Sequence, residues 1–174
     1  MSTPEFSRPV SLRQIDSRPV TIEANEAERA ALSRRFDIAG IERLVATLDL
    51  VRDGTKVRIS GAMQATIDQI CSVSGEEFRH SLEDDVALVF VPALPRSSDQ
   101  QEVEIELERE ELDEIEYEGD AIDIGEAVAQ TLALAIDPYA EGPDADAARK
   151  RAGITGDDAP SGALAEALAA LKKN

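Results

Sequence analysis

Two residues of this sequence are the obvious candidates for nucleophilic or acid–base chemistry, the single cysteine, Cys71, and the single histidine, His80. One cysteine excludes an intramolecular disulfide and a multi-cysteine metal cluster. The acidic neighbours Asp68, Glu76 and Glu77 are expected to raise the pKa of the thiol, which disfavours its use as a nucleophile. His80 falls on the apolar face of a predicted strand, and no serine or cysteine motif accompanies it. We expect both residues to be structural.

Short acidic clusters are the next candidates. Glu83, Asp84 and Asp85 are consecutive, and adjacent residues of a strand point to opposite faces, so we expect no convergent carboxylate pair. Calcium loops need acids at alternate positions around a central glycine, and Asp144 and Asp146 lack that context. We therefore expect no catalytic residue, no metal ligand and no cofactor, and a protein that is not an enzyme.

Charge is the strongest chemical signal in the chain. The net charge is −18, and residues 98–126 hold fourteen acidic side chains and one basic side chain, a net of −13. Such a field repels phosphate backbones and attracts basic proteins with salt-sensitive steering. The plainer interpretation is that these charges serve solubility alone. We predict a protein-docking surface, the acidic docking set, made of Glu102, Glu104, Glu106, Glu108, Glu110, Glu111, Asp113, Glu114, Glu116 and Glu118.

A basic set lies at the other end of the chain. Residues 1–60 are nearly neutral, with ten basic and nine acidic side chains. Four arginines there, Arg29, Arg34, Arg35 and Arg43, could contact RNA phosphates while the acidic segment faces elsewhere. Arginines on a short helix are also ordinary surface, so direct RNA binding is the alternative hypothesis.

The elements that must position these residues begin with short strands over residues 6–10 and 20–24. Asn25 then suits the N-cap of a helix, with Glu28 three residues later as in a capping box. We expect this helix to end near Phe36.

The middle of the chain predicts three long antiparallel strands in succession. Apolar residues alternate with polar ones, as in strands with one buried face. Asp53-Gly54 suits a tight hairpin turn, and Gly61 predicts a bulge or bend. The strands are expected over residues 41–52, 57–67 and 78–91, with a turn at 71–75.

A second helix is predicted from Asp123 to Ile136. Asp123 suits its N-cap, and Glu126 is placed to return the bond of a capping box. Apolar residues surround the helix, Leu134 included, which predicts burial across the apolar face of the sheet. Asp137-Pro138 ends it.

Residues 103–115 allow two interpretations. Residues 103–107 could form an edge strand, and a helix over 108–115 is the competing interpretation. We expect one α+β domain over residues 1–138, a curved and mostly antiparallel sheet or half-barrel covered by the buried helix. Residues 139–174 are expected to form a mobile linker with a helical turn at 145–151 and a C-terminal helix at 163–172.

The composition of the chain argues against several further classes of protein. Aromatic residues make up only 3% of the chain, which argues against a stacking platform for nucleic-acid bases. No apolar run approaches the roughly 20 residues of a membrane-spanning helix, and the first residues do not resemble a secretory signal. We expect a cytoplasmic protein.

The order of these pieces carries a resemblance. Residues 119–126 read Gly-Asp-x-Ile-Asp-Ile-x-Glu, a helix with Leu-Ala-Leu and then Asp-Pro follows, and the chain ends in Leu-Ala-Ala-Leu-Lys. With the turn at Cys71, this order resembles the YceD family, the large ribosomal RNA subunit accumulation proteins, over nearly the whole chain. The most specific part is 119–138, and its motif residues, to which we assign a structural role, are Gly119, Asp120, Asp123, Glu126 and Pro138.

The resemblance implies a cytoplasmic bacterial factor needed for normal accumulation of large-subunit ribosomal RNA, and not an enzyme. Its implied partner is a basic ribosomal protein or a large-subunit precursor particle. Many family members carry a Cys-x-x-Cys pair at the turn, but here the second position is Ser74. A structural zinc site needs about four ligands, so zinc does not carry over to this chain.

Overall fold

A computed structural model of the 174-residue chain describes residues 4–16, 18–93 and 114–154. The chain forms two compact units, Met1–Asp68 with Arg79–Asp137, and Gln69–Phe78 with Pro138–Asn174. The first unit is α+β, as predicted, and its sheet is not closed into a barrel.

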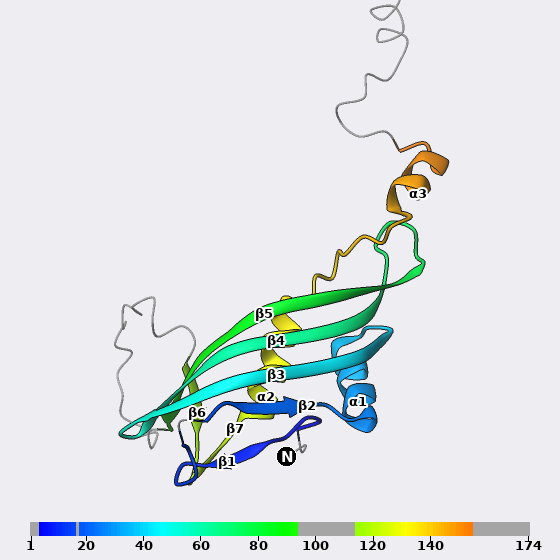
Figure 1. The fold of residues 1–174 in the computed structure, drawn as a ribbon. Helices are drawn as coiled ribbons and strands as arrows, with labels where there is room; N and C mark the ends of the chain where they lie inside the picture. The colour runs from blue at the N-terminus through cyan, green and yellow to red at the C-terminus, as the bar shows by residue number, and fades with distance from the viewer. Residues whose placement is uncertain (1–3, 17, 94–113, 155–174) are drawn as a thin grey trace, which may run out of the picture. The chain divides into compact units, whose positions relative to one another are not determined.

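Ten elements are found in the described residues (Figure 1). The strands are β1 (Pro9–Ser11), β2 (Val20–Glu23), β3 (Gly40–Asp53), β4 (Lys56–Ile70), β5 (Glu77–Pro92), β6 (Glu114–Tyr117) and β7 (Ala121–Asp123). The helices are α1 (Glu26–Phe36), α2 (Ile124–Ala135) and α3 (Ala145–Arg151).

The main sheet has the strand order β2-β3-β4-β5-β6, and β1 pairs with β7 in a separate two-stranded sheet. The three long strands β3, β4 and β5 confirm the predicted succession. β6 pairs with β5 in parallel, with Val89 opposite Glu114. The suggested strand at 103–107 lies outside the described residues. The competing helix over 108–115 is wrong at its end, because Glu114 and Ile115 belong to β6.

Alternation of side chains builds the core between the sheet and α2. In β3, Leu44, Ala46, Leu48 and Leu50 are all buried, as the predicted period of two requires. The hairpin from β3 to β4 turns at Gly54, whose φ of 62° is a conformation that glycine adopts readily.

Gly61 does not mark a bulge, which is one of the two features predicted for it. It pairs in register with Leu48, and the irregularity of this strand pair lies between Ile41 and Arg43. A Cβ on Gly61 would lie 2.1 Å from the carbonyl oxygen of Thr47. Glycine is therefore needed here for the close approach of two backbones.

The first helix forms as predicted. The Asn25 side chain accepts the backbone N–H of Glu28, and the Glu28 carboxylate accepts that of Asn25, which completes a capping box. Leu32 anchors α1 in the core.

The N-terminal strand begins further along the sequence than predicted. β1 begins at Pro9, where it pairs with Asp123 of β7. Phe6 precedes it in irregular structure, yet its side chain is fully buried in the core.

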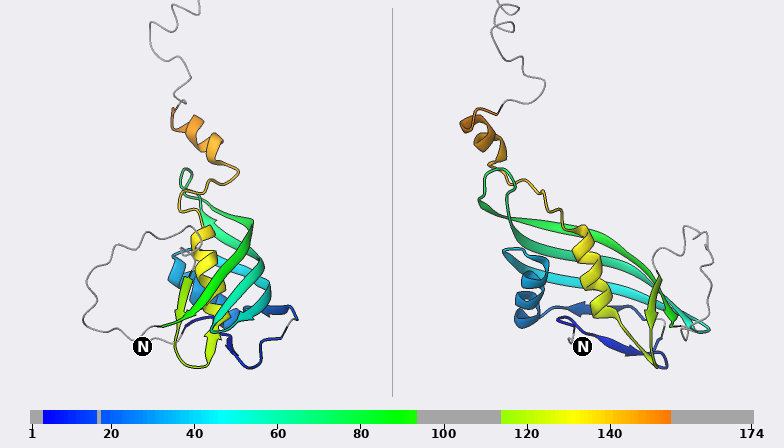
Figure 2. Two further views of the ribbon diagram at one scale, coloured as in Figure 1. Left: turned by 90° about the vertical axis from the view of Figure 1, so that its left-hand side faces the viewer. Right: turned by 180° about the vertical axis from the view of Figure 1, so that it is seen from behind.

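The second helix crosses the face of the main sheet, as predicted, and the view from behind shows it in front of β3, β4 and β5 (Figure 2). Val128 and Leu132 are buried. The predicted burial on nearly every side is wrong at its C-terminal end, where Leu134 is 89% exposed. The stripe through Leu132 faces the core, and Leu134 lies on the opposite side of the helix.

The second unit is built around the turn after β4. The backbone N–H and the hydroxyl of Ser72 donate to the carbonyl oxygens of Ala140 and Tyr139. The helical turn predicted at 145–151 is confirmed as α3. The helix predicted at 163–172 lies outside the described residues.

Candidate functional site

The described part of the acidic docking set lies on β6 and the residue after it. Glu114, Glu116 and Glu118 are exposed. Tyr117 points the other way and is buried, and its hydroxyl donates 2.7 Å to the carbonyl oxygen of Thr55. Strand alternation therefore directs these carboxylates to solvent, with apolar anchors between them.

One of the three carboxylates has an internal partner. Glu114 forms an ion pair of 2.9 Å with Lys56. Glu116 on the strand and Glu118 just after it are also exposed, and neither forms an ion pair with another described residue. The other members of the set, Glu102 to Asp113, lie outside the described residues.

The motif aspartate is the centre of a second acidic cluster, at the start of α2. Asp123 Oδ1 accepts the backbone N–H groups of Gly125 and Glu126, which confirms it as the N-cap. The same carboxylate accepts the Ser7 hydroxyl at 2.5 Å and the Arg8 backbone N–H at 2.8 Å. Ser7 and Arg8 have no local sequence signal that would have found them.

Arg8 extends this cluster to α1. Its guanidinium donates to both oxygens of Glu28, at 2.6 and 2.8 Å. This hydrogen bond raises the pKa of Arg8 and lowers the pKa of Glu28. Glu28 therefore completes the capping box of α1 and binds the N-terminal segment at the same time.

Glu126 does not return a capping-box bond, contrary to the prediction. Its carboxylate accepts two hydrogen bonds from Arg35, at 2.8 and 2.9 Å, and Arg35 also pairs with Glu5. A bidentate charged pair is stronger than a neutral N–H bond. The hydrogen bond from Arg35 also lowers the pKa of Glu126.

Two of the remaining motif residues, Gly119 and Asp120, lie just before β7, and the third, Pro138, does not lie at this end of α2. Gly119 turns the chain between β6 and β7 with a φ of 83°. The Asp120 carbonyl oxygen accepts the N–H of Leu12, which extends the pairing of β1 with β7. Pro138 follows the end of α2 and begins the second part of the other unit.

The predicted basic set does not form one free patch. Arg35 is held by Glu126, and Arg29 donates 2.7 Å to the carbonyl oxygen of Ala24. Arg34 is exposed on α1. Arg43 is exposed on β3, with Glu23 at 3.9 Å. Arg34 and Arg43 are thus the members best placed to reach a partner.

The structure corrects the prediction for the pKa of the Cys71 thiol. This thiol is buried, and its pKa is lowered to about 7, not raised. The causes are hydrogen bonds from the Ser74 hydroxyl and from the backbone N–H groups of Ser74 and Gly142. These donors lie against the sulfur, with Ser74 N at 3.3 Å from Sγ.

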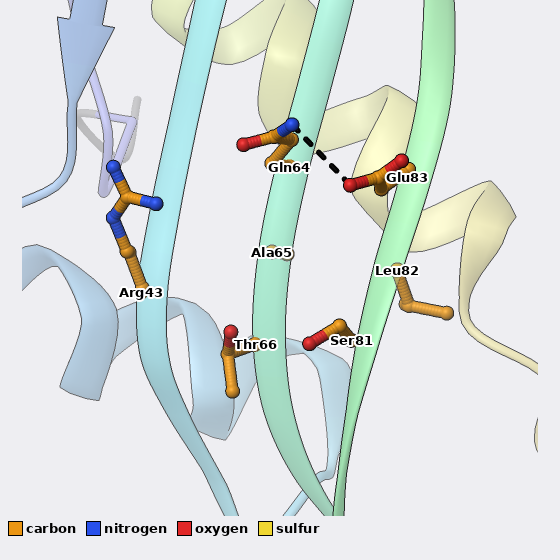
Figure 3. Close-up of a pocket in the computed structure, with 7 residues that line it drawn as sticks. All are labelled: Arg43, Gln64, Ala65, Thr66, Ser81, Leu82 and Glu83. Atoms are coloured by element: carbon orange, nitrogen blue, oxygen red, sulfur yellow. Dashed lines mark hydrogen bonds between the residues drawn. The ribbon is translucent and has the colours of Figure 1, made fainter.

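The outer face of the sheet, away from α2, carries a hollow of about 120 Å³ between β3, β4 and β5 (Figure 3). Its polar lining includes Arg43 and a hydrogen bond of 3.3 Å from Gln64 to Glu83. A neighbouring hollow touches Glu83, Asp84 and Asp85. All three acids are exposed.

Neither a candidate metal site nor a membrane-spanning helix is found among the described residues. They contain no group of three or more histidine, cysteine or acidic residues that could hold a metal ion. Among the helices described here, none combines the length and the apolar character that a bilayer crossing requires.

Comparison with protein families gives a match over most of the chain. The model of the family described as large ribosomal RNA subunit accumulation protein YceD matches residues 59–173. Comparison with curated proteins and with solved structures gives no match. The matched range covers the turn at Cys71, β6 and the whole of the Gly119–Pro138 motif. The chain therefore belongs to the YceD family.

Proposed function

We propose that this protein is a non-enzymatic factor that supports the accumulation of large-subunit ribosomal RNA. It acts by binding a basic ribosomal protein, or a large-subunit precursor particle that displays one, through the acidic docking set. The family match over residues 59–173 carries the proposal. The net charge of −13 over residues 98–126 supports this mechanism, because a strong negative field steers basic proteins to their site.

The geometry of β6 supports the same mechanism. Glu116 and Glu118 face solvent, and Tyr117 fixes the strand to the hairpin between β3 and β4 through the Thr55 carbonyl oxygen. Carboxylates held on an anchored strand lose less conformational entropy on binding than carboxylates on a free chain.

The connection between β5 and β6 is longer than its path requires. The register sets Pro92 beside Tyr117 and Val89 beside Glu114, so the chain must return by only about 10 Å along the strands. Residues 93–113 could span roughly 70 Å when extended. This surplus, which contains most of the acidic docking set, is expected of a binding segment rather than of a simple crossover.

Capture of large-subunit ribosomal proteins and precursor particles on the immobilised protein tests the proposal. Two variants remove the acidic charge, Glu116→Lys with Glu118→Lys, and the fourfold change of Glu104, Glu106, Glu108 and Glu110 to Gln. A control with the same charge change, Asp49→Lys with Asp85→Lys, alters acids on the sheet instead. We expect the two acidic-set variants to lose capture, the control to retain it, and moderate salt to weaken it.

Equal capture by all of these proteins would contradict the proposal. Direct RNA binding is then the alternative, and gel shifts with ribosomal RNA fragments would detect it. Arg34→Ala with Arg43→Ala is the suitable variant for that arm. Arg35 is unsuitable because its replacement would also break the ion pair with Glu126.

A further inference from the structure

An extended segment near the N-terminus, here called the strap, lies over the start of α2. The strap, residues 5–11, places the Phe6 side chain fully inside the core. A Cβ on Gly125 would lie 2.4 Å from the Phe6 carbonyl oxygen and 2.9 Å from the Arg8 nitrogen. The strap backbone therefore lies directly on the helix, and glycine at this position of the motif makes the contact possible.

The residues beneath the strap, Glu28, Asp123 and Gly125, are here called the seat. They contact a serine and an arginine that follow each other in the strap. Asp123 accepts both the Ser7 hydroxyl and the Arg8 N–H. The Arg8 guanidinium reaches Glu28 with two bonds and the Glu23 carbonyl oxygen at 3.0 Å. It also lies 4.6 Å from the centre of the Phe6 ring. Planar bidentate recognition of this kind distinguishes arginine from lysine.

We propose that this seat, formed by Glu28, Asp123 and Gly125, is a second binding site, for an extended Ser-Arg segment of a basic polypeptide. The strap occupies the seat as an autoinhibitory ligand of the same chain. Part of the proposal rests on the proposed function, since that function identifies the natural competitor as a basic protein. The chemistry of the seat is argued from the strap that fills it.

The outer half of the strap is weakly held. β1 has three residues and pairs only with β7, outside the main sheet. Two-stranded sheets are marginal in stability, and such elements open more easily than the core. A competitor gains access only in the opened fraction, so its apparent dissociation constant is raised by the reciprocal of that fraction. A change that weakens the strap should therefore strengthen binding in trans.

The test uses the full chain and a labelled peptide of residues 4–12, Pro-Glu-Phe-Ser-Arg-Pro-Val-Ser-Leu. Arg8→Ala in the protein weakens the strap, and Ser7→Ala does so independently if the first variant folds poorly by circular dichroism. The same peptide with Arg8→Glu is the matched control. Fluorescence anisotropy gives the dissociation constant for each pair.

An engineered disulfide, which can be reduced again, would hold the strap in place and so have the opposite effect to Arg8→Ala and Ser7→Ala. Leu12 N donates to Asp120 O, and Ile124 N donates to Arg8 O. Ser11 and Ala121, which pair between these hydrogen-bonded positions, are therefore the closely spaced kind of pair that a disulfide can join. Ser11→Cys with Ala121→Cys, in a Cys71→Ser background, fixes the strap when oxidised and frees it when reduced.

We expect the peptide to bind Arg8→Ala or Ser7→Ala about tenfold or more tightly than the unaltered protein. The oxidised lock should bind it least, and reduction should restore binding. Equal binding to locked and reduced protein, or no gain in either strap variant, would overturn the inference. Failure here leaves the capture of ribosomal proteins by the acidic docking set unaffected, so the two proposals fail separately.

Discussion

The Ser7 hydroxyl lies 2.5 Å from the Asp123 carboxylate, a hydrogen bond between residues 116 positions apart. The same carboxylate also accepts the backbone N–H groups of Arg8, Gly125 and Glu126. A carboxylate has about four acceptor positions, so Asp123 is fully occupied by the protein itself. The aspartate of the family motif therefore joins the N-terminal strap to α2.

Replacing Asp123 should destabilise the fold. Asp123→Ala removes the N-cap of α2 and the partner of the strap, and we expect a loss of about 2–4 kcal/mol in the free energy of unfolding. Urea denaturation followed by circular dichroism measures it. Asp120→Ala, at an exposed side chain of the same motif, is the control. Equal stability of the two variants would refute the conclusion that Asp123 connects the strap to α2.

The close approach at Gly61 gives a second prediction. Gly61→Ala places a methyl group against the Thr47 carbonyl oxygen, and the backbone must move, at a cost of about 2–3 kcal/mol. Gly40→Ala meets only the end of the Asp68 side chain at 3.1 Å and should stay within about 1 kcal/mol of the original. Thermal unfolding of both variants compares them, and similar melting temperatures would count against this account.

Acidic pH should weaken the ion pair between Arg35 of α1 and Glu126 of α2. The pKa of Glu126 is lowered from its ordinary value of 4.5, chiefly by the hydrogen bond from Arg35. A carboxyl with a depressed pKa stabilises the fold fully above its unfolded value, and this contribution is lost as pH falls through the folded value. Glu126→Gln should therefore be less stable at neutral pH and converge with the original protein in acid.

Urea midpoints as a function of pH test this prediction. Asp49→Asn, an exposed change on β3, is the matched control. If the curves of Glu126→Gln and the original protein ran parallel down to the lowest pH, the ion pair would not be the source of the difference.

Cys71 should titrate near neutrality. Its pKa is lowered from 9.0 to about 7, chiefly by the Ser74 hydroxyl. The thiolate absorbance should show a midpoint near 7, and Ser74→Ala should raise that midpoint, whereas Ser81→Ala should not. Because the folded pKa is depressed, the thiolate contribution to stability is complete above about pH 9 and disappears as pH falls through about 7. The original protein should therefore gain more stability than Cys71→Ala over this interval.

Local patterns in the sequence predict the parts of the fold that depend on neighbours in the chain. The alternation of Leu44, Ala46, Leu48 and Leu50 predicts β3, and Asn25 and Asp123 predict the starts of both larger helices. In each case the signal lies within a few residues of the element that it specifies.

Contacts between distant residues had no such signal. Arg35 and Glu126 are 91 positions apart, and only the finished fold brings them together. The predicted capping role of Glu126 was wrong for this reason, since a charged partner replaced the local one. Cys71 is similar only in part. Its acidic neighbours in sequence predict a raised pKa, but hydrogen bonds from nearby Ser74 lower it most, and the N–H of Gly142, remote in sequence, adds to them.

The amounts of large- and small-subunit ribosomal RNA in cells that lack this protein test the central claim most directly. The rescuing genes should encode the original protein, the Glu116→Lys/Glu118→Lys variant and the Asp49→Lys/Asp85→Lys control at equal levels. We predict a selective loss of large-subunit RNA that the original protein and the control restore and the acidic-set variant does not. Full restoration by the acidic-set variant, or normal large-subunit RNA in cells without the protein, would contradict the account.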